Sequence, residues 1–177
     1  ARFIGSNPNI KMPFKRYQIG EVFRDGPIAS SRYRQFTQCD IDVVGSSSLA
    51  ADAEIISLIY AAFSKLSLNA VVKANNRELL NDILDYCGIE KNLQESVILS
   101  IDKLEKLGIT VVKNELKQQK LDDKKINRVI DIITIKGNNQ EKIKQLKNIL
   151  KNSEGLAEID QLMAYLKNFN DGIEFDV

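Results

Sequence analysis

Two runs of alternating side chains, separated by a short polar loop, constrain the fold of this 177-residue chain more than any other feature. Residues 14–24 place β-branched and aromatic side chains between polar ones, which is the period-two pattern of a half-buried strand. Residues 32–44 repeat that pattern, and the intervening residues 25–31 are rich in the glycine, proline and serine typical of turns. The sequence therefore predicts a long antiparallel hairpin with a seven-residue tip.

Helical periodicity replaces the alternation after Gly45. Ser46–Ser48 offer an N-cap to a helix expected at 49–66, and a short strand expected at 70–74 leads to a helix at 77–86 that Gly88 should end. From residue 89 to residue 168 the chain is interpreted as a separate, mostly helical insertion, with lysine-rich helices at 121–135 and 140–150. Residues 172–177 should start a strand that rejoins the first sheet. The predicted fold class is α+β, an antiparallel sheet with flanking helices plus a mostly helical (α or α/β) insertion domain.

The composition excludes several classes of protein. The longest mainly apolar stretch, residues 58–63, is far shorter than the roughly 20 residues that cross a bilayer, so no membrane association is expected. Two cysteines, Cys39 and Cys87, form neither a zinc motif nor a disulfide framework, which favours a reducing, cytoplasmic setting. The chain contains no histidine, so histidine-based catalysis within it is excluded. The first residues do not resemble a signal peptide and include no start methionine. We therefore expect this sequence to be an internal piece of a longer protein.

Positive charge is concentrated in one segment. Residues 103–152 hold 13 Lys and Arg against 6 Asp and Glu, whereas the rest of the chain holds 12 against 18. Lysines that contact phosphates release condensed counterions, so this segment could bind nucleic acid. Lysine-rich helices are equally often solvated faces, and the count alone leaves both interpretations open.

The second strand carries the residues with the clearest chemical potential. Because alternate residues of a strand share a face, Tyr33, Thr37, Cys39, Ile41 and Val43 should form the core side. The other face would present Arg32, Arg34, Phe36, Gln38, Asp40 and Asp42, with Arg24 nearby on the partner strand. Guanidiniums bind phosphates, an aromatic ring stacks on a purine, and carboxylates accept hydrogen bonds from an ammonium or an imidazole. A solvated face with cross-strand ion pairs would show the same alternation.

At these positions the sequence resembles a known family. Phe23-Arg24, the loop, and the run from Arg32 to Asp40 resemble motif 2 of the class II aminoacyl-tRNA synthetases in its histidyl form. The stretches at 13–20, 51–54, 76–80 and 102–108 are also similar to histidyl-tRNA synthetases, densely up to Gly108 and sparsely beyond it. The run from Gln38 to Asp42 resembles archaeal and eukaryotic members more than most bacterial ones.

The resemblance implies an ATP site on the hairpin. Arg24 would be the catalytic residue, contacting the α-phosphate of ATP and the histidine carboxylate, while Phe36 would stack on adenine and Arg32 would approach the phosphates. Mg²⁺ would accompany ATP, and no metal site made by the protein itself is implied. Ser31 stands where the family usually has glycine, which would cost on the order of 1 kcal/mol if the loop requires a positive φ there.

The resemblance also implies a histidine site. Arg24, Gln38 and Asp42 would bind L-histidine, with Gln38 at the α-amino end and Asp42 accepting a hydrogen bond from the imidazole. Arg34 and Asp40 are left open between direct contacts and supporting ion pairs. Residues 1–88 and 169–177 would be part of the catalytic core, with the motif 2 hairpin at 14–44, and residues 89–168 would be the insertion domain.

The complete enzyme would join histidine to tRNA(His) through a histidyl-adenylate, as a homodimer. Motif 1, motif 3, the histidyl-specific arginine motif and the anticodon-binding domain are not present in this sequence, so this piece alone is expected to be inactive. Two rivals share the fold: the regulatory subunit of ATP phosphoribosyltransferase and a synthetase-like domain of a sensor kinase. Retention of Arg24, Arg32, Phe36, Gln38 and Asp42 together argues against the regulatory subunit.

Overall fold

The computed structural model describes residues 2–30, 32–169 and 172–177, and the chain divides into two compact units at residues 59 and 60. Each unit is described by itself. The first consists of a short helix, a hairpin and most of one helix, whereas the second is built mainly of helices around a two-stranded sheet. The α+β class predicted from the sequence is confirmed.

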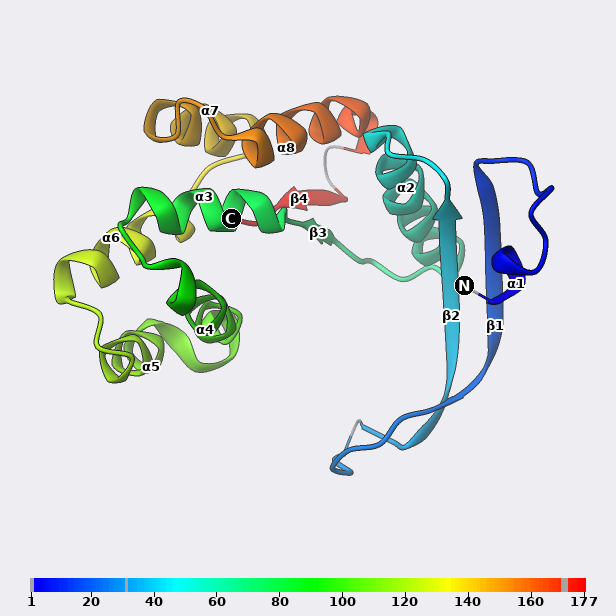
Figure 1. Ribbon diagram of the computed structural model, residues 1–177, viewed down its shortest axis with the longest axis horizontal. Coiled ribbons are helices and arrows are strands. Elements are labelled where there is room, and N and C mark those ends of the chain that lie inside the picture. The colour runs from blue at the N-terminus through cyan, green and yellow to red at the C-terminus, as the bar shows by residue number, and fades with distance from the viewer. Residues whose placement is uncertain (1, 31, 170–171) are drawn as a thin grey trace. The chain divides into compact units, whose positions relative to one another are not determined.

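The predicted hairpin dominates the first unit (Figure 1). After α1 (Arg2–Gly5), the strands β1 (Phe14–Phe23) and β2 (Gln35–Val44) pair antiparallel along their whole length, from Phe14 opposite Val44 to Phe23 opposite Gln35. The register runs without a bulge. Side-chain parity therefore holds from one end of the ladder to the other.

The tip of the hairpin is longer than predicted. Strand β2 begins at Gln35 rather than Arg32, although one further bond from the Arg24 N–H to the Arg34 carbonyl, 2.8 Å, continues the ladder. Arg32 instead exchanges backbone hydrogen bonds of 3.0 and 3.2 Å with Ala29 in a tight turn. Because the Arg32 N–H and carbonyl are both bonded to Ala29, they do not pair across the hairpin ladder. Ser31, the departure from the family pattern, lies outside the described residues.

Helix α2 (Leu49–Lys65) starts where the sequence predicts, with the Ala50 N–H donating to Ser48 Oγ at 3.2 Å. Within the first unit it packs behind the hairpin. Glu54 forms an ion pair of 2.6 Å with Lys15 Nζ. Ile55 and Leu58 share a small cavity of about 160 Å³ with strand residues that include Tyr17, Ile41 and Val43. This end of the hairpin is half-buried.

Farther along the hairpin, the expected core side is exposed in the part of the chain that the structure describes. Tyr17 is 77% exposed, as is Phe23, and Ile19 is 65% exposed. Cys39 and Tyr33, both predicted to face a core, are exposed as well. The prediction holds for Ile41 and Val43 only, because α2 reaches no farther along the strands in the described first unit.

The second unit is a helical assembly whose boundaries follow from local signals. Asn76 caps α3 (Arg77–Tyr86) by accepting from the Leu79 N–H at 3.1 Å, and Gly88 ends it with φ 74°. The elements that follow are α4 (Lys91–Ile101), α5 (Leu104–Gln118), α6 (Asp123–Ile133), α7 (Asn139–Ile149), α8 (Glu154–Tyr165) and the 3₁₀ turn η1 (Lys167–Phe169). Gly108, with φ 80°, breaks α5 near its start.

The last strand pairs differently from the prediction. β4 (Ile173–Phe175) pairs in parallel with β3 (Val72–Ala74), and the described strands form two separate two-stranded sheets. Parallel strands need a long crossover, and here the helices from α3 to α8 supply it. The prediction missed this pairing because a three-residue strand carries too little pattern to identify its partner.

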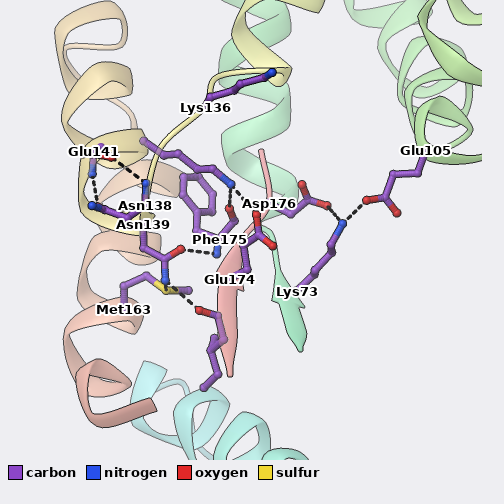
Figure 2. Close-up of polar contacts among 12 residues, drawn as sticks. Lys73, Glu105, Lys136, Asn138, Asn139, Glu141, Met163, Glu174, Phe175 and Asp176 are labelled. Atoms are coloured by element: carbon purple, nitrogen blue, oxygen red, sulfur yellow. Dashed lines mark hydrogen bonds and ion pairs between the residues drawn. The ribbon is translucent and has the colours of Figure 1, made fainter. Parts of the chain in front are cut away.

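Two side chains of α7 hold the outer edge of β4 (Figure 2). The Asn139 amide donates to the Ile173 carbonyl at 3.0 Å and accepts from the Phe175 N–H at 2.9 Å, as a neighbouring strand would. Lys142, 7% exposed, donates to Glu174 Oε1 at 2.9 Å and to the Phe175 carbonyl at 2.8 Å. The Lys142 ammonium, through this hydrogen bond, lowers the pKa of Glu174. The backbone N–H and carbonyl groups on the outer edge of β4 are thereby hydrogen-bonded without a third strand.

Helix α3 belongs by packing to the helical unit. It lies against α8, α4 and α6, and Gly155 of α8 approaches so closely that a Cβ would stand 2.2 Å from the Leu79 nitrogen. The compact units therefore divide the chain at a different place from the predicted boundary at residue 88. The assignment of 89–168 as an insertion stays a prediction.

Among residues 2–30, 32–169 and 172–177, no helix combines the length and the apolar character needed to cross a membrane.

Candidate functional site

The hairpin gathers the predicted site residues on one face, which we call the polar face. In the observed register Phe36, Gln38, Asp40 and Asp42 stand opposite Val22, Gly20, Gln18 and Arg16. Ile41 pairs with Tyr17 and lies on the opposite, apolar face, so Phe36 and Ile41 are on different faces as the alternation predicts. Helix α2 packs on the apolar face through the Lys15–Glu54 ion pair, and Arg16 and Asp42 line the same small cavity as Ile55 and Leu58 of α2.

Arg24 and Phe36 meet at one end of the polar face. The Arg24 guanidinium carbon lies 5.2 Å from the centroid of the Phe36 ring. The contact follows from the register, because Val22 is opposite Phe36 and residue 24 is the diagonal neighbour on the same face. A cation over an aromatic ring is a modest attraction, about 0.5–1 kcal/mol at an exposed site. The guanidinium and the ring thus form one unit that offers charge and a stacking surface together.

The middle of the polar face is open. Gly20 lies opposite Gln38, and among the described residues nothing lies within 4 Å of the position that a Cβ on Gly20 would occupy. The Gln38 amide donates to Asp40 Oδ1 at 2.5 Å. This bond leaves the Gln38 carbonyl oxygen as an acceptor beside the open space.

Asp42 lies at the far end of the polar face and is held by a residue that the sequence interpretation did not single out. Arg16, directly opposite on β1, donates from Nε to Asp42 Oδ2 at 2.6 Å. Its NH1 donates to Gln18 Oε1 at 3.0 Å. The predicted tip, residues 25–31, would have placed residue 24 opposite 32 and Arg16 opposite Asp40, so the Arg16–Asp42 pair follows only from the observed register.

The two remaining arginines lie at the tip rather than along the strand. Arg34 pairs with Arg24 in the ladder, and its Nε donates to the Gly26 carbonyl at 3.3 Å. Arg32 belongs to the turn with Ala29, three residues before β2 begins. The structure thus groups Arg24, Phe36, Gln38 and Asp42 on one face of the ladder and puts Arg32 at the hairpin tip.

Other candidate locations in the chain lack suitable chemistry. A hollow of about 630 Å³ beside α7 is lined by Asn138, Asn139 and Glu174, but its Asn139 and Glu174 side chains are engaged in holding β4. The Cys87 thiol is buried, and burial raises its pKa to about 11, so it is a poor nucleophile. Within the described ranges, no group of three or more His, Cys, Asp or Glu side chains converges as a metal site.

Comparison with known proteins decides the family. The family model described as histidyl-tRNA synthetase matches residues 1–177. The chain belongs to the histidyl-tRNA synthetase family. Of the curated relatives, Histidine--tRNA ligase 2 of Shouchella clausii is 47% identical over 129 residues, which cover 73% of this chain and 30% of that protein. Histidine--tRNA ligase 1 of Bacillus anthracis is 40% identical over 169 residues, covering 94% of this chain and 39% of the relative.

A solved histidyl-tRNA synthetase has the same fold. The crystal structure of the enzyme from Nostoc sp. PCC 7120 superimposes with a TM-score of 0.84 at 30% identity, covering 98% of this chain and 43% of that one. The chain thus spans well under half the length of these relatives. All three are bacterial, and the resemblance of residues 38–42 to archaeal and eukaryotic members stays a prediction.

Proposed function

We propose that this chain is the ATP- and histidine-binding hairpin and adjoining helical region of a histidine–tRNA ligase. The observation that carries the proposal is the polar face, where Arg24, Phe36, Gln38 and Asp42 follow one another in family order on a continuous ladder. About 20 Å of strand separate Phe36 from Asp42, at 3.3 Å per residue, which gives room for a nucleotide and an amino acid end to end.

The ATP end is assigned to Arg24 and Phe36. Adenine stacks on the Phe36 ring, and the Arg24 guanidinium turns from the ring toward the α-phosphate, where its paired N–H groups match phosphate oxygens. Arg32, exposed at the tip, reaches the outer phosphates. Mg²⁺ enters with ATP as part of the substrate.

The histidine end is assigned to Gln38 and Asp42. The Gln38 side-chain oxygen accepts from the α-ammonium group, and Asp42 accepts from the imidazole N–H. The histidine carboxylate then points along the strand toward Arg24 and the α-phosphate. Attack on phosphorus requires little proton transfer, since the nucleophile is already a carboxylate, so positioning and charge neutralisation supply the catalysis. A chain without histidine residues fits this chemistry.

The rival among the fold's relatives is a regulatory paralogue that binds no adenylate. The presence of Arg24, Phe36, Gln38 and Asp42 together on the polar face favours the enzyme. Homodimerisation and a cytoplasmic location are proposed for the full-length protein from its family, and the chain's own residues add nothing to either.

Histidine-dependent ATP–pyrophosphate exchange tests the proposal. A full-length protein that carries this sequence should exchange radiolabelled pyrophosphate into ATP when histidine is present and not with the other amino acids. A regulatory paralogue would show no exchange with any amino acid, and that result would refute the proposed function.

We also propose that the basic segment binds the tRNA partner. The structure divides its lysines into two groups. Lys103, Lys117, Lys142 and Lys147 form ion pairs with Glu115, Asp123, Glu174 and Asp160. In contrast, Lys120, Lys124 and Lys125, around the turn from α5 to α6, have no carboxylate within 4.0 Å in the described ranges. Unpaired lysines are the ones that gain most from binding phosphates.

Replacing Lys120, Lys124 and Lys125 together by glutamine in the full-length protein should weaken tRNA(His) binding. It should also lower the slope of log K against log salt concentration by roughly 0.7–0.9 for each phosphate that the protein no longer neutralises. The matched control replaces the paired Lys103, Lys117 and Lys147, which changes the net charge equally. Equal effects of the two triple variants on affinity and slope would favour a solvated face over an RNA surface.

A further inference from the structure

The Arg16–Asp42 pair joins the start of β1 to the proposed histidine end of the site. The two residues are directly opposite in the ladder, and the Nε to Oδ2 distance is 2.6 Å. A second bond, from Arg16 NH1 to Gln18 Oε1 at 3.0 Å, holds the guanidinium at two points. The other carboxylate oxygen, Asp42 Oδ1, receives no hydrogen bond from the residues that the structure describes.

Stability alone does not explain this arrangement. The side chains of Arg16 and Asp42 are 42% and 45% exposed, and ion pairs in that range add little to folding. The neighbouring residue Lys15 makes an equally short pair with Glu54, on the apolar face, and that pair joins the strand to helix α2. Arg16, by contrast, links only the two strands of the hairpin that carries it, because Asp42 lies on β2 and Gln18 on β1.

We propose that Arg16 is a positioning residue for Asp42. Its guanidinium occupies one Asp42 carboxylate oxygen, neutralises the carboxylate charge and leaves Oδ1 to accept from an uncharged imidazole N–H. The inference rests on the proposed histidine pocket and deepens it. A bare carboxylate at this position would attract any cation, including protonated imidazole. A carboxylate already paired with a guanidinium gains much less from a second positive charge, so it discriminates in favour of the neutral ring.

The other charged groups near this end support the assignment. On the polar face Asp40 is two residues from Asp42 and is engaged by Gln38, while Arg24 and Arg34 lie at the opposite end of the ladder. Lys15 and Glu54, on the apolar face, neutralise each other. Helix α1, which touches Phe14 through Phe3, adds the exposed Arg2. Arg16 is the cation in direct contact with Asp42 among the described residues.

The pH dependence of histidine binding is the readout that a merely structural role would not change. Histidine's imidazole ionises near pH 6.5, so a site that accepts only the neutral ring should show a KM for histidine about fourfold higher at pH 6.0 than at pH 8.0. Arg16→Met leaves Asp42 unpaired, and its KM should become nearly independent of pH over this range.

The experiment uses the full-length protein in histidine-dependent ATP–pyrophosphate exchange. Arg16→Met should lower kcat/KM for histidine by about tenfold at pH 8.0 with little change in the KM for ATP. Arg16→Lys, which keeps the charge, should restore the pH dependence. Lys15→Met is the matched control, since it removes an equally short ion pair from the other face, and it should leave both KM values unchanged.

Each outcome separates the inference from the function on which it rests. If Arg16→Met behaves like Lys15→Met, or raises the KM for ATP and histidine together, the positioning role is wrong. Asp42→Asn distinguishes a failure of the proposed Arg16 role from a failure of the proposed histidine pocket. If it weakens histidine binding while Arg16→Met does not, only the role of Arg16 fails. If Asp42→Asn leaves histidine activation intact, the histidine pocket itself is misplaced and the inference falls with it.

Discussion

Replacing Arg24 with alanine in a full-length protein that carries this chain should lower kcat for histidine-dependent ATP–pyrophosphate exchange by about 10²–10³-fold. The reason is the place of Arg24 in the ladder. Its N–H bonds the Arg34 carbonyl at 2.8 Å, so the backbone is fixed, while the guanidinium lies over Phe36 at the proposed junction of ATP and amino acid. Charge that develops on the α-phosphate during attack would be stabilised by this guanidinium more than the ground state is.

The kinetic pattern identifies the role. Removal of an interaction made only in the transition state lowers kcat and kcat/KM together, whereas removal of a ground-state interaction raises the KM for ATP with kcat preserved. Arg128→Ala is a suitable control, because its guanidinium also lies over an aromatic ring, 5.6 Å from the centroid of Tyr86, far from the hairpin in sequence. A similar fall in kcat for both variants would mean that removing a cation–π interaction, and not an effect on catalysis, explains the result.

The hairpin was predictable because its information is local. Alternation over more than ten residues on each side of a polar loop specifies two strands, and an unbroken register then fixes which side chains share a face. That is why Phe36 and Ile41 fall on opposite faces as expected. The helix caps at Ser48, Asn76 and Gly88 were predictable for the same reason, since each depends on one residue and its immediate neighbours.

The parts that failed depend on distant partners. Strand β4 pairs with β3, about 100 residues earlier, and its other edge is held by Asn139 and Lys142, a combination that no short pattern specifies. The exposure of Tyr17 and Phe23 likewise depends on what covers the apolar face. Arg32 left the predicted strand because the tip loop bonds to itself. Arg16 was overlooked because its significance comes from the residue opposite, not from its own surroundings in the sequence.

The second large effect concerns the choice of amino acid. Asp42→Ala in the full-length protein should reduce kcat/KM for histidine by at least about tenfold, because it removes a charge-assisted hydrogen bond worth about 1.5–3 kcal/mol. The reduction should be larger than for Asp42→Asn. The alanine variant leaves both an imidazole N–H and Arg16 Nε without their acceptor, whereas asparagine retains one oxygen for either group.

Substitutions at the two ends of the polar face should affect the KM values for histidine and for ATP separately. Asp42 and Phe36 are six residues apart on the same strand, so a change at Asp42 leaves the stacking surface for adenine in place. The KM for ATP should therefore stay near its wild-type value in Asp42→Ala, measured at saturating histidine. Phe36→Leu is the reciprocal variant, and it should raise the KM for ATP with a smaller effect on histidine. If Asp42→Ala instead raised the KM for ATP, or left histidine activation intact, Asp42 would not be the residue that recognises the imidazole.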